Sequence, residues 1–571
     1  MRAPRTLGIA ATIAGLLATA AAVRGAGSPK FYDDDPIQEE PASQDASGVK
    51  HYEPDLFYDL AENIFYKPGD QDFDTRARNV NTIDEVPDGA WFVNRAGTHP
   101  LAAADVARGA NTSDTAPAGP WTIIAAKTDG ITPGFTVRDE AGRVWFIKFD
   151  PPGYRGMATG TEVVVSKLFW ALGYHTTEYY IAKLQIEALR IDDKATYTPP
   201  GGDRRAMRRE DIQPLLKRAD RDPDGSYRVI ASLATPGTPV GRIRFYGTRP
   251  DDPNDLVPHE HRRELRGYKV FAAWFNHVDA KSTNSIDMLV TKNGRAYVQH
   301  YLLDFGSALG SGAIGPREYW EGYENLMEPP KQIGRRILTV GIPPLDWHTD
   351  PFFESRAIGR LRSNNAEWNP DEWQPRVPNA AFLRARADDR FWAARKAMAI
   401  TDGIISAVVE EGQFGDPESQ QFLVRALRER RDAIGRKYLP AINPVVDPVL
   451  SADGTLTFAN AAVQSGFAAA PAQYTAAWST FDNNTGATSP IGASESVDTR
   501  IAAPAALPSS PGAFVRIELS ARSSDHPSWA RPVHIYFRRQ ASAWQLVGFE
   551  RLPDGAGASS ATLDDPARRE P

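Results

Sequence analysis

Two apolar runs around an Asn-Gly turn restrict how this 571-residue chain can fold more than any other feature. The stretch MLVTKNGRAYVQHYLLDF, residues 288–305, alternates apolar and polar residues on both sides of Asn293-Gly294. Asn-Gly between two such runs is the strongest short-range signal for a β-hairpin. A hairpin returns the chain to its starting edge, so we expect Asn284, just before it, and Asp304, at its end, to lie opposite each other.

The polar residues on either side of this hairpin follow an ordered pattern. HVDAKSTN supplies His277, Asp279 and Asn284 in the spacing H-x-D-x-x-x-x-N, and Asp304 is followed by Phe-Gly. Phosphoryl transfer needs one carboxylate to position the attacking hydroxyl, and an amide and a second carboxylate to hold metal ions. The pattern is that of the protein-kinase catalytic loop followed by Asp-Phe-Gly. The chain therefore resembles the protein-kinase-like superfamily from about residue 121 to about residue 439.

The resemblance implies a role for each residue of this pattern. Asp279 would be the catalytic base, His277 would be a further catalytic residue at the start of the same loop, and Lys281 would touch the transferred phosphate. Asn284 and Asp304 would hold magnesium, and ATP would be the phosphate donor. Each residue also has an ordinary reading, because a lone histidine is most often a core residue and a lone asparagine a turn former.

The upstream half matches the same superfamily. The text WFIKFD places Lys148 on the third of three expected strands, where the family keeps its phosphate-binding lysine, and Glu162 lies in the helix that follows. The phosphate loop would use Gly130 and Gly134, since no G-x-G-x-x-G is present. The text IKFD followed by ALGY resembles HipA-like kinases, and LDFGSALG resembles phosphoinositide kinases. With A-P-E also missing, the resemblance is to an atypical kinase.

Glu162 has a competing local role. Thr159-Gly-Thr-Glu162 has the form of a capping box, in which Thr159 would begin the helix and Glu162 would bind back to the amide of Thr159. An ion pair between Glu162 and Lys148 and this capping role are both open at the level of sequence.

The order of predicted elements favours an α+β chain with a two-lobed, protein-kinase-like fold and an appended C-terminal all-β domain. The expected order is a signal peptide (1–25), a tether and N-terminal extension (26–117), an N-lobe (118–254) with a charged insertion (about 191–230), a helical C-lobe (255–443), a small β-sandwich-like domain (444–555) and a disordered tail (556–571).

Several local expectations follow from composition. The acidic stretch 31–48, FYDDDPIQEEPASQDASG, predicts a flexible tether, and residues 241–247, GRIRFYG, predict a strand. Residues 208–218 predict a short helix, and residues 315–440 are expected to be mostly helical. Two arginine groups (Arg204, Arg205, Arg208 and Arg209; Arg428, Arg430 and Arg431) are expected to lie on solvated faces and could contact an anionic partner.

The N-terminus indicates export. A basic start, MRAPR, precedes the apolar, alanine-rich run TLGIAATIAGLLATAAAV, which is typical of a cleaved signal peptide. An uncleaved membrane anchor is the alternative, because the run nears spanning length. The chain has no cysteine, which excludes disulfides, thiolate nucleophiles and zinc-cysteine sites. A net charge of −7 argues against a nucleic-acid-binding protein.

Two functions are consistent with these features. The first is an exported atypical kinase, periplasmic or extracellular, that transfers a phosphoryl group from ATP and magnesium to a hydroxyl of a protein, lipid or glycan. The second is a non-catalytic kinase-like module that binds an envelope component, with the β-domain recognising the partner. The scarcity of ATP outside the cytoplasm favours the second function, whereas the complete set of polar residues favours the first.

Overall fold

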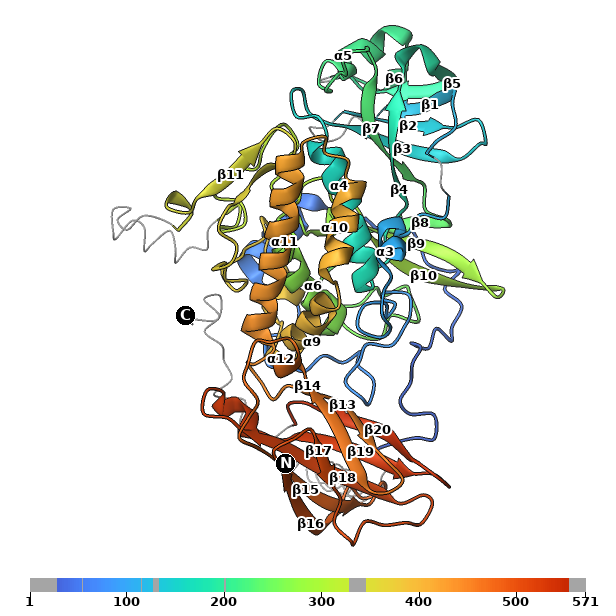
Figure 1. Cartoon of the computed structure of the whole chain (residues 1–571). Coiled ribbons are helices and arrows are strands. Elements are labelled where there is room, and N and C mark those ends of the chain that lie inside the picture. The colour runs from blue at the N-terminus through green and yellow to red at the C-terminus, as the bar shows by residue number, and fades with distance from the viewer. Residues whose placement is uncertain are drawn as a thin grey trace, which may run out of the picture.

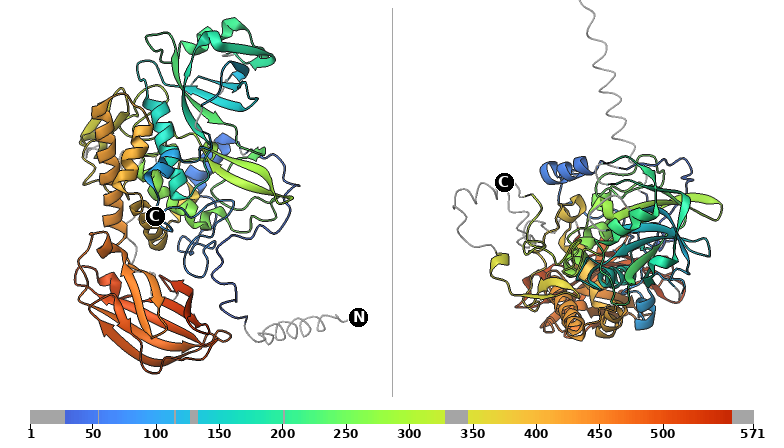
Figure 2. Two further views of the ribbon diagram at one scale, coloured as in Figure 1. Left: turned by 45° about the vertical axis from the view of Figure 1, so that its right-hand side comes forward. Right: turned by 90° about the horizontal axis from the view of Figure 1, so that it is seen from above.

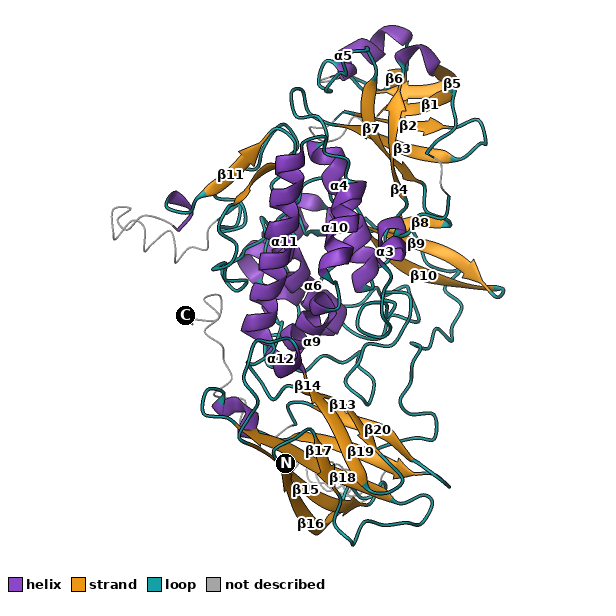
Figure 3. Ribbon diagram, viewed as in Figure 1, coloured by secondary structure: helices purple, strands orange, loops and turns teal. Residues whose placement is uncertain are grey.

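The computed structural model describes residues 28–53, 55–113, 116–126, 133–199, 202–327 and 346–553. The expected signal peptide, the expected tail and Gly130 lie outside these residues. The larger groups of strands lie at the two ends of the molecule, and most helices lie between them with two small sheets at their sides (Figure 1, Figure 3). The α+β class expected from sequence is confirmed. None of the described helices combines the length and the apolar character needed to cross a bilayer.

A seven-stranded sheet forms one end of the molecule. Its strands are β1 (Trp121–Ala126), β2 (Gly134–Arg138), β3 (Val144–Phe149), β4 (Tyr179–Leu184), β5 (Leu189–Tyr197), β6 (Arg205–Ala206) and β7 (Tyr227–Leu233). They lie in the order β4-β7-β3-β2-β1-β5-β6. Most of the sheet's buried residues, among them Trp145, Phe149 and Val229, form a cluster separate from the main core.

The segment expected to be a charged insertion, about residues 191–230, contributes strands to the sheet. Strand β5 pairs in parallel with β1, and β7 pairs with both β3 and β4, so this segment builds the sheet. The helix expected at residues 208–218 is shorter, α5 (Ile212–Leu216) after a 3₁₀ turn. Ile212, Leu215 and Leu216 are buried in the sheet's own core, and this apolar face holds the charged stretch in place.

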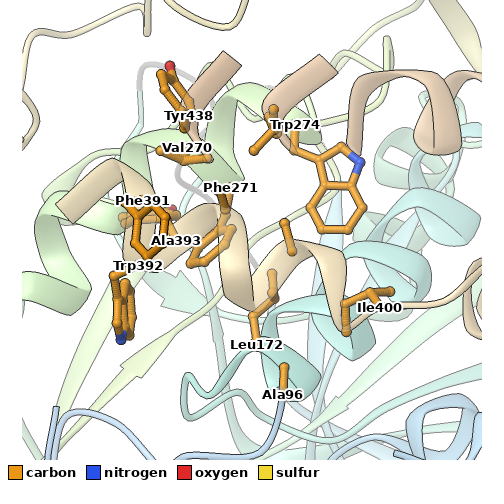
Figure 4. Packing of buried hydrophobic residues seen from close by; sticks show 14 of the residues in the cluster. Ala96, Leu172, Val270, Phe271, Trp274, Phe391, Trp392, Ala393, Ile400 and Tyr438 are labelled. Atoms are coloured by element: carbon orange, nitrogen blue, oxygen red, sulfur yellow. The ribbon is translucent and has the colours of Figure 1, made fainter. Parts of the chain in front are cut away.

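The middle of the molecule is built from helices. They are α3 (Ala103–Arg108), α4 (Met157–Leu172), α6 (Arg263–Trp274), α8 (Ala380–Leu383), α9 (Ala387–Met398), α10 (Asp402–Glu411) and α11 (Pro417–Tyr438). Figure 4 shows the packing at their centre, where Phe271 and Trp274 of α6, Trp392 of α9 and Leu172 of α4 belong to one cluster and the rings of Phe271 and Trp392 have centroids 6.4 Å apart. These residues are buried.

The expected hairpin is present and borders the helices. Strands β9 (Ser285–Lys292) and β10 (Arg295–Leu302) pair in antiparallel register, with β8 (Thr238–Gly241) on the outer side of β9. The prediction of a strand at residues 241–247 is wrong for the residues after Gly241. Ile243 donates its amide to the side chain of Ser285, so it does not continue a backbone ladder.

Residues 315–379 depart from the expected helical pattern. The described part holds loops and a small hairpin, β11 (Phe352–Ser355) with β12 (Gly359–Arg362), and the long helices begin only at α9. Glycine and proline interrupt the pattern here: Gly310 and Gly359 have φ angles of 92° and 81° and their backbones meet closely. Such positive φ angles end helical structure.

The described part of the C-terminal region contains two sheets, a short α-helix, α12 (Ala461–Gln464), and a 3₁₀ turn (Pro527–Ala530). The strands are β13 (Val445–Leu450), β14 (Thr455–Asn460), β15 (Gln473–Phe481), β16 (Thr488–Ser496), β17 (Arg500–Ala502), β18 (Phe514–Arg522), β19 (Val533–Arg539) and β20 (Trp544–Glu550). Their orders are β13-β14-β17 and β16-β15-β18-β19-β20, and β19 and β20 form the hairpin that the sequence indicates. Buried residues here, Trp478 and Trp529 among them, belong to the same cluster as the helical core.

The prediction that the acidic residues 31–48 form a flexible tether is wrong. Phe31 is buried among Phe481, Phe514 and Tyr536 of the C-terminal strands, and Lys30 forms an ion pair with Glu550. Further along, Ala46 donates its amide to Ala296 O and Tyr52 donates to Val240 O. We call residues 28–53 the strap, because they run from the C-terminal sheets to the β8-β9-β10 sheet (Figure 2).

After the strap come a short helix, α2 (Leu56–Ala61), and a π-helical turn (Glu62–Tyr66).

Candidate active site

Lys148 lies where the seven-stranded sheet meets the helices. In β3 the neighbouring Ile147 and Phe149 point into the sheet's own core, so Lys148 points to the other face. Its Nζ is 2.8 Å from Asp304 Oδ1 and 3.5 Å from Glu162 Oε2. Burial by itself lowers the pKa of Lys148, but the charges of Asp304 and Glu162 outweigh it and raise the pKa above its ordinary value.

Glu162 connects Lys148 to the turn after the hairpin. Its carboxylate accepts the amide of Phe305 at 3.0 Å and that of Gly306 at 2.9 Å, and it is 2% exposed. Burial raises the pKa of Glu162, whereas the charge of Lys148 opposes that rise. The three side chains therefore meet although Lys148 and Asp304 are 156 residues apart in the chain.

The capping-box alternative for Glu162 is wrong. Helix α4 begins at Met157, so Thr159 lies inside it. Thr159 donates its hydroxyl to Asp150 at 2.8 Å, and Glu162 faces Phe305 and Gly306.

Asp150 performs the capping that Thr159 was expected to do, and sequence reasoning missed it. Its carboxylate accepts the amides of Gly156, Ala158 and Thr159 at 2.8–2.9 Å, which satisfies free amides at the start of α4. Asp150 stands two residues after Lys148, at the end of a strand and shortly before a helix. An aspartate in that place is a helix-start signal that could have identified it.

The backbone at Asp304 and Gly306 is adapted to this contact. Asp304 has a φ angle of 63°, a left-handed conformation that non-glycine residues rarely adopt. A Cβ atom on Gly306 would lie 2.7 Å from Glu162 Oε2. Phe305 is fully buried, and its ring stacks on Phe169 with centroids 5.2 Å apart. The turn is thus held by an aromatic contact on one side and by Glu162 on the other.

The loop before the hairpin presents Asp279, Lys281 and Asn284. Lys281 Nζ is 2.8 Å from Asp279 Oδ1, and Asn284 donates its side-chain amide to Asp279 O at 2.9 Å and to Asp279 Oδ2 at 3.1 Å. Burial alone raises the pKa of Asp279, but Lys281 and Arg317 overcome it and lower the pKa to about 2. Asp279 is therefore ionised at neutral pH.

Asn284 and Asp304 occupy the adjacent ends of the hairpin, as its register dictates. Ser285 pairs with Leu302, and Leu303 donates its amide to Asn284 O at 3.1 Å. No group of three or more histidine, aspartate or glutamate side chains suited to a metal ion occurs among the described residues. An amide and a carboxylate nevertheless suit magnesium, which is commonly bound through one or two protein ligands, substrate phosphates and water.

His277, expected to be a catalytic residue, lies in the hydrophobic core, which corrects that expectation. It is fully buried, and its ring contacts the rings of Phe169, Tyr268 and Phe305 at centroid distances of 5.7–6.3 Å. Burial lowers the pKa of His277 to about 4, so the ring is neutral at pH 7. Its position beneath Phe305 makes it a packing residue.

The glycines expected to cradle phosphates are only partly described. Gly134 begins β2 and pairs with Lys148 in the ladder, so its backbone lies next to the lysine. Gly130 lies outside the described residues.

Two arginines near Asp279 were not foreseen from sequence. Arg376 Nη1 is 3.9 Å from Asp279 Oδ1, and both Arg376 and Arg317 bind Glu321. They come from segments 38 and 97 residues beyond Asp279 (317 − 279 and 376 − 279), in a region without regular periodicity. No short motif marks them, because their place depends on how the loops fold back.

Comparison with known proteins gives distant likenesses. No protein-family model matches the chain, and no curated protein matches it by sequence. Among solved structures, the proinflammatory kinase CtkA of Helicobacter pylori is similar at 12% identity, covering 55% of this chain and 97% of its own, with a TM-score of 0.26. The Golgi casein kinase is similar at 10% identity, covering 70% of this chain and 94% of its own, with a TM-score of 0.27. A second structure of that kinase, with Mn and ADP bound, gives the same values. We rest the assignment below on the side-chain geometry.

Proposed function

We propose that this chain is an exported, kinase-like phosphotransferase with two lobes and a C-terminal β-domain. One observation carries the proposal: Lys148, Glu162 and Asp304 meet at 2.8 and 3.5 Å from three separate elements, next to the loop that holds Asp279 and Asn284. A lysine held between two carboxylates, with a third, ionised carboxylate nearby, is the arrangement that phosphoryl transfer uses.

The residues divide the work between binding and positioning. Lys148 binds the phosphate oxygens of a nucleotide and is held in place by Glu162, which is itself fixed by the amides of the turn after Asp304. Asn284 and Asp304 would hold magnesium, which supplies charge neutralisation at the transferred phosphate when bound. Fixed charges in a partly dry cleft act more strongly than they do in water.

Asp279 orients the acceptor hydroxyl, and Lys281 lies beside it to meet the transferred phosphate. With a pKa of about 2, Asp279 is a weak proton acceptor, so its contribution is mainly to position the hydroxyl. Lys281 is ion-paired with Asp279 at 2.8 Å in the structure and must leave that contact to reach a phosphate.

Export and the hydroxyl acceptor form part of the same proposal. The N-terminal sequence supports delivery to the periplasm or the extracellular space, where the acceptor would be a protein, lipid or glycan of the envelope. Because ATP is scarce there, phosphate donors other than ATP should also be tested.

The decisive experiment measures thermal stabilisation by nucleotides with magnesium. We expect ATP with magnesium to raise the Tm of the wild-type protein, and the rise to vanish in Asp304→Ala. Asp224→Ala is the matched control, because Asp224 also forms an ion pair with a lysine, Lys183, but on the outer part of the sheet. ADP, GTP and pyrophosphate as further ligands identify the donor class.

A second variant separates an enzyme from a binding module. Asp279→Ala should keep the stabilisation by ATP and lose turnover of ATP. If the wild-type protein binds ATP without turnover in the presence of envelope extracts, the non-catalytic alternative is correct. If no nucleotide shifts the Tm of the wild type, the site does not bind nucleotides and the proposal fails.

A further inference from the structure

Arg228, on β7, reaches out of the seven-stranded sheet and binds two helices. It is 6% exposed, and its Nε donates a hydrogen bond to Thr159 Oγ1 at 2.8 Å. Its Nη1 and Nη2 donate to Gln413 O at 2.9 Å and to Gly412 O at 2.7 Å. Thr159 lies in the first turn of α4, and Gly412 is the residue that ends α10. One side chain thus joins the sheet to the start of α4 and to the end of α10.

The surroundings of Arg228 suit a buried cation. The carbonyls of Gly412 and Gln413 lie at the C-terminal end of α10, where the backbone carries partial negative charge. Asp150, which caps α4, lies 3.7 Å from Nε of Arg228 and opposes the fall in the pKa of Arg228 that burial causes. A guanidinium stays protonated in proteins, and burial of this one is tolerated because each of its nitrogens has an acceptor.

The two helices meet closely where Arg228 binds them. Gly160 follows Thr159 in α4, and a Cβ atom on Gly160 would lie 2.6 Å from Gly412 O and 2.6 Å from the ring of Phe414. A residue with a side chain would therefore force the two helices apart. The start of α4 and the end of α10 form one close-packed support, and Arg228 attaches the sheet to it.

The sheet and α4 also carry the lysine and the glutamate of the candidate active site. Strand β7 pairs with β3 so that Ile230 lies opposite Lys148, two residues after Arg228. Glu162 lies three residues after Thr159, about one turn along α4. The contact of Arg228 with Thr159 and the contact of Lys148 with Glu162 are thus two neighbouring links between the sheet and α4.

We propose that Arg228 is a positioning residue for phosphoryl transfer, which holds the start of α4 against the sheet and so keeps Glu162 within reach of Lys148. The inference rests on the function proposed above. Each nitrogen of Arg228 is occupied by the protein, so Arg228 acts through α4 and not on a ligand. Glu162 Oε2 is 3.5 Å from Lys148 Nζ, at the outer limit of a hydrogen bond, so a small shift of α4 separates them. A displacement of about 1 Å in an active site can cost about a hundred-fold in rate.

The variant Arg228→Lys tests this role in the full chain. A lysine keeps the charge, but one ammonium group cannot replace the planar fork at three acceptors. We expect kcat for turnover of the phosphate donor to fall about ten-fold or more. Arg155→Lys is the matched control: Arg155 directly precedes the N-cap of α4 and pairs with Asp222, but its side chain is 47% exposed, so the variant should keep the kcat of the wild type.

The variant Glu162→Gln separates positioning from a general loss of structure. If Arg228 acts through Glu162, adding Arg228→Lys to Glu162→Gln should reduce kcat little further, whereas independent effects multiply. A reduction by the same factor in both backgrounds would assign Arg228 to the fold alone and overturn the inference. Should Arg228→Lys fail to fold, Thr159→Val, which removes the acceptor of Nε, should lower kcat, and Thr159→Ser, which keeps the hydroxyl, should not; equal kcat values in these two variants would also overturn the inference.

A distance measurement tests the contact without any turnover. The chain has no cysteine, so Lys183→Cys on β4 and Glu410→Cys on α10, both at exposed positions, give two unique sites for spin labels. We expect the distance between the labels to be more broadly distributed in Arg228→Lys than in the wild type or in Arg155→Lys. Unchanged label distances or an unchanged kcat in Arg228→Lys would overturn the inference. If the wild type turns over no donor, the proposed function fails and this inference fails with it, whereas the label distances still report whether Arg228 holds the sheet to α10.

Discussion

The two sheet regions at opposite ends of the molecule are attached to its helical middle in different ways. The seven-stranded sheet keeps most of its apolar residues in a separate core and contributes little more than Tyr179 and Ile230 to the main cluster. The C-terminal strands share one continuous core with α9 and α11, and the strap holds them from a second side. The seven-stranded sheet thus meets the helices at a boundary between two separate cores, which we call the seam. The C-terminal strands, by contrast, share their core with the helices.

The candidate active site lies on that seam. Lys148 comes from the sheet with its separate core, whereas Glu162 lies on α4, which packs in the main cluster with Phe305. Polar contacts hold two regions together less strongly than a shared apolar core does. We therefore expect the seven-stranded sheet to be the region that shifts most when a ligand binds. The candidate active site thus lies between two separate cores, whereas the C-terminal strands share a continuous core with the helices.

The largest effects should come from truncating one buried tryptophan in each region. Trp145→Ala and Trp529→Ala each remove a fully buried ring, and each should lower the free energy of unfolding by about 3–5 kcal/mol. Hydrogen exchange should distinguish them: Trp145→Ala should increase exchange within β1–β7, and Trp529→Ala should increase it in α9 and α11 as well. If Trp145→Ala loosens α11 equally, the two cores are not separate.

The strap provides the next largest effect. Phe31→Ala removes a buried ring from among Phe481, Phe514 and Tyr536 and should lower the stability of the C-terminal strands by about 3 kcal/mol. Phe57→Ala, at an aromatic residue that is 78% exposed, is the control and should change little. Chemical denaturation of both variants measures the difference, and equal midpoints would show that the strap contributes nothing.

A change at the seam should affect activity and leave stability nearly unchanged. Lys148→Met should reduce ATP turnover about a hundred-fold or more, the usual consequence of losing a charge that stabilises the transition state. Its Tm should stay close to that of the wild type, because Asp304 is partly open to solvent and the buried Glu162 keeps its hydrogen bonds from the amides of Phe305 and Gly306. Lys183→Met, which removes the exposed lysine paired with Asp224, should alter neither quantity. A large fall in Tm for Lys148→Met alone would mean that the seam is structural.

The smallest effect concerns pH and the main core. The pKa of His277 is about 4 in the folded protein against 6.5 for an ordinary histidine, so the unfolded chain binds a proton more readily between these values. Stability from this residue is complete above pH 6.5 and is lost as pH falls toward 4, by about 2 kcal/mol at pH 5. In His277→Leu the free energy of unfolding should change less between pH 6.5 and pH 4 than it does in the wild type. If the two proteins lose stability equally over this pH range, the pKa of His277 is not lowered.

The parts of this molecule that the sequence predicts are those encoded locally. The Asn293-Gly294 hairpin, the strand that carries Lys148 and the long helix α11 follow from turn chemistry and periodicity. The hairpin register in turn brings Asn284 beside the residue that precedes Asp304.

The parts that the sequence does not predict depend on distant partners. The acidic composition of the strap predicts disorder, whereas in the structure its residues contact distant partners, such as Phe31 against strands more than 400 residues later. The charged residues around Arg430 predict a surface position, whereas in the structure Trp368 covers its side chain. The function of Asp150 depends on where α4 begins, and helix boundaries are the least reliable part of any prediction from sequence.

The strap also bears on the order in which the protein can be completed. Phe31 accepts a hydrogen bond from Asn483 across 452 residues, and Lys30 reaches Glu550 across 520. Lys30 must therefore wait, without its partner, until 520 further residues have been synthesised, and contacts this distant in sequence form slowly. Closure of the strap is then a late folding step. In a chain truncated before β20, the ring of Phe31 would lack part of its apolar surroundings.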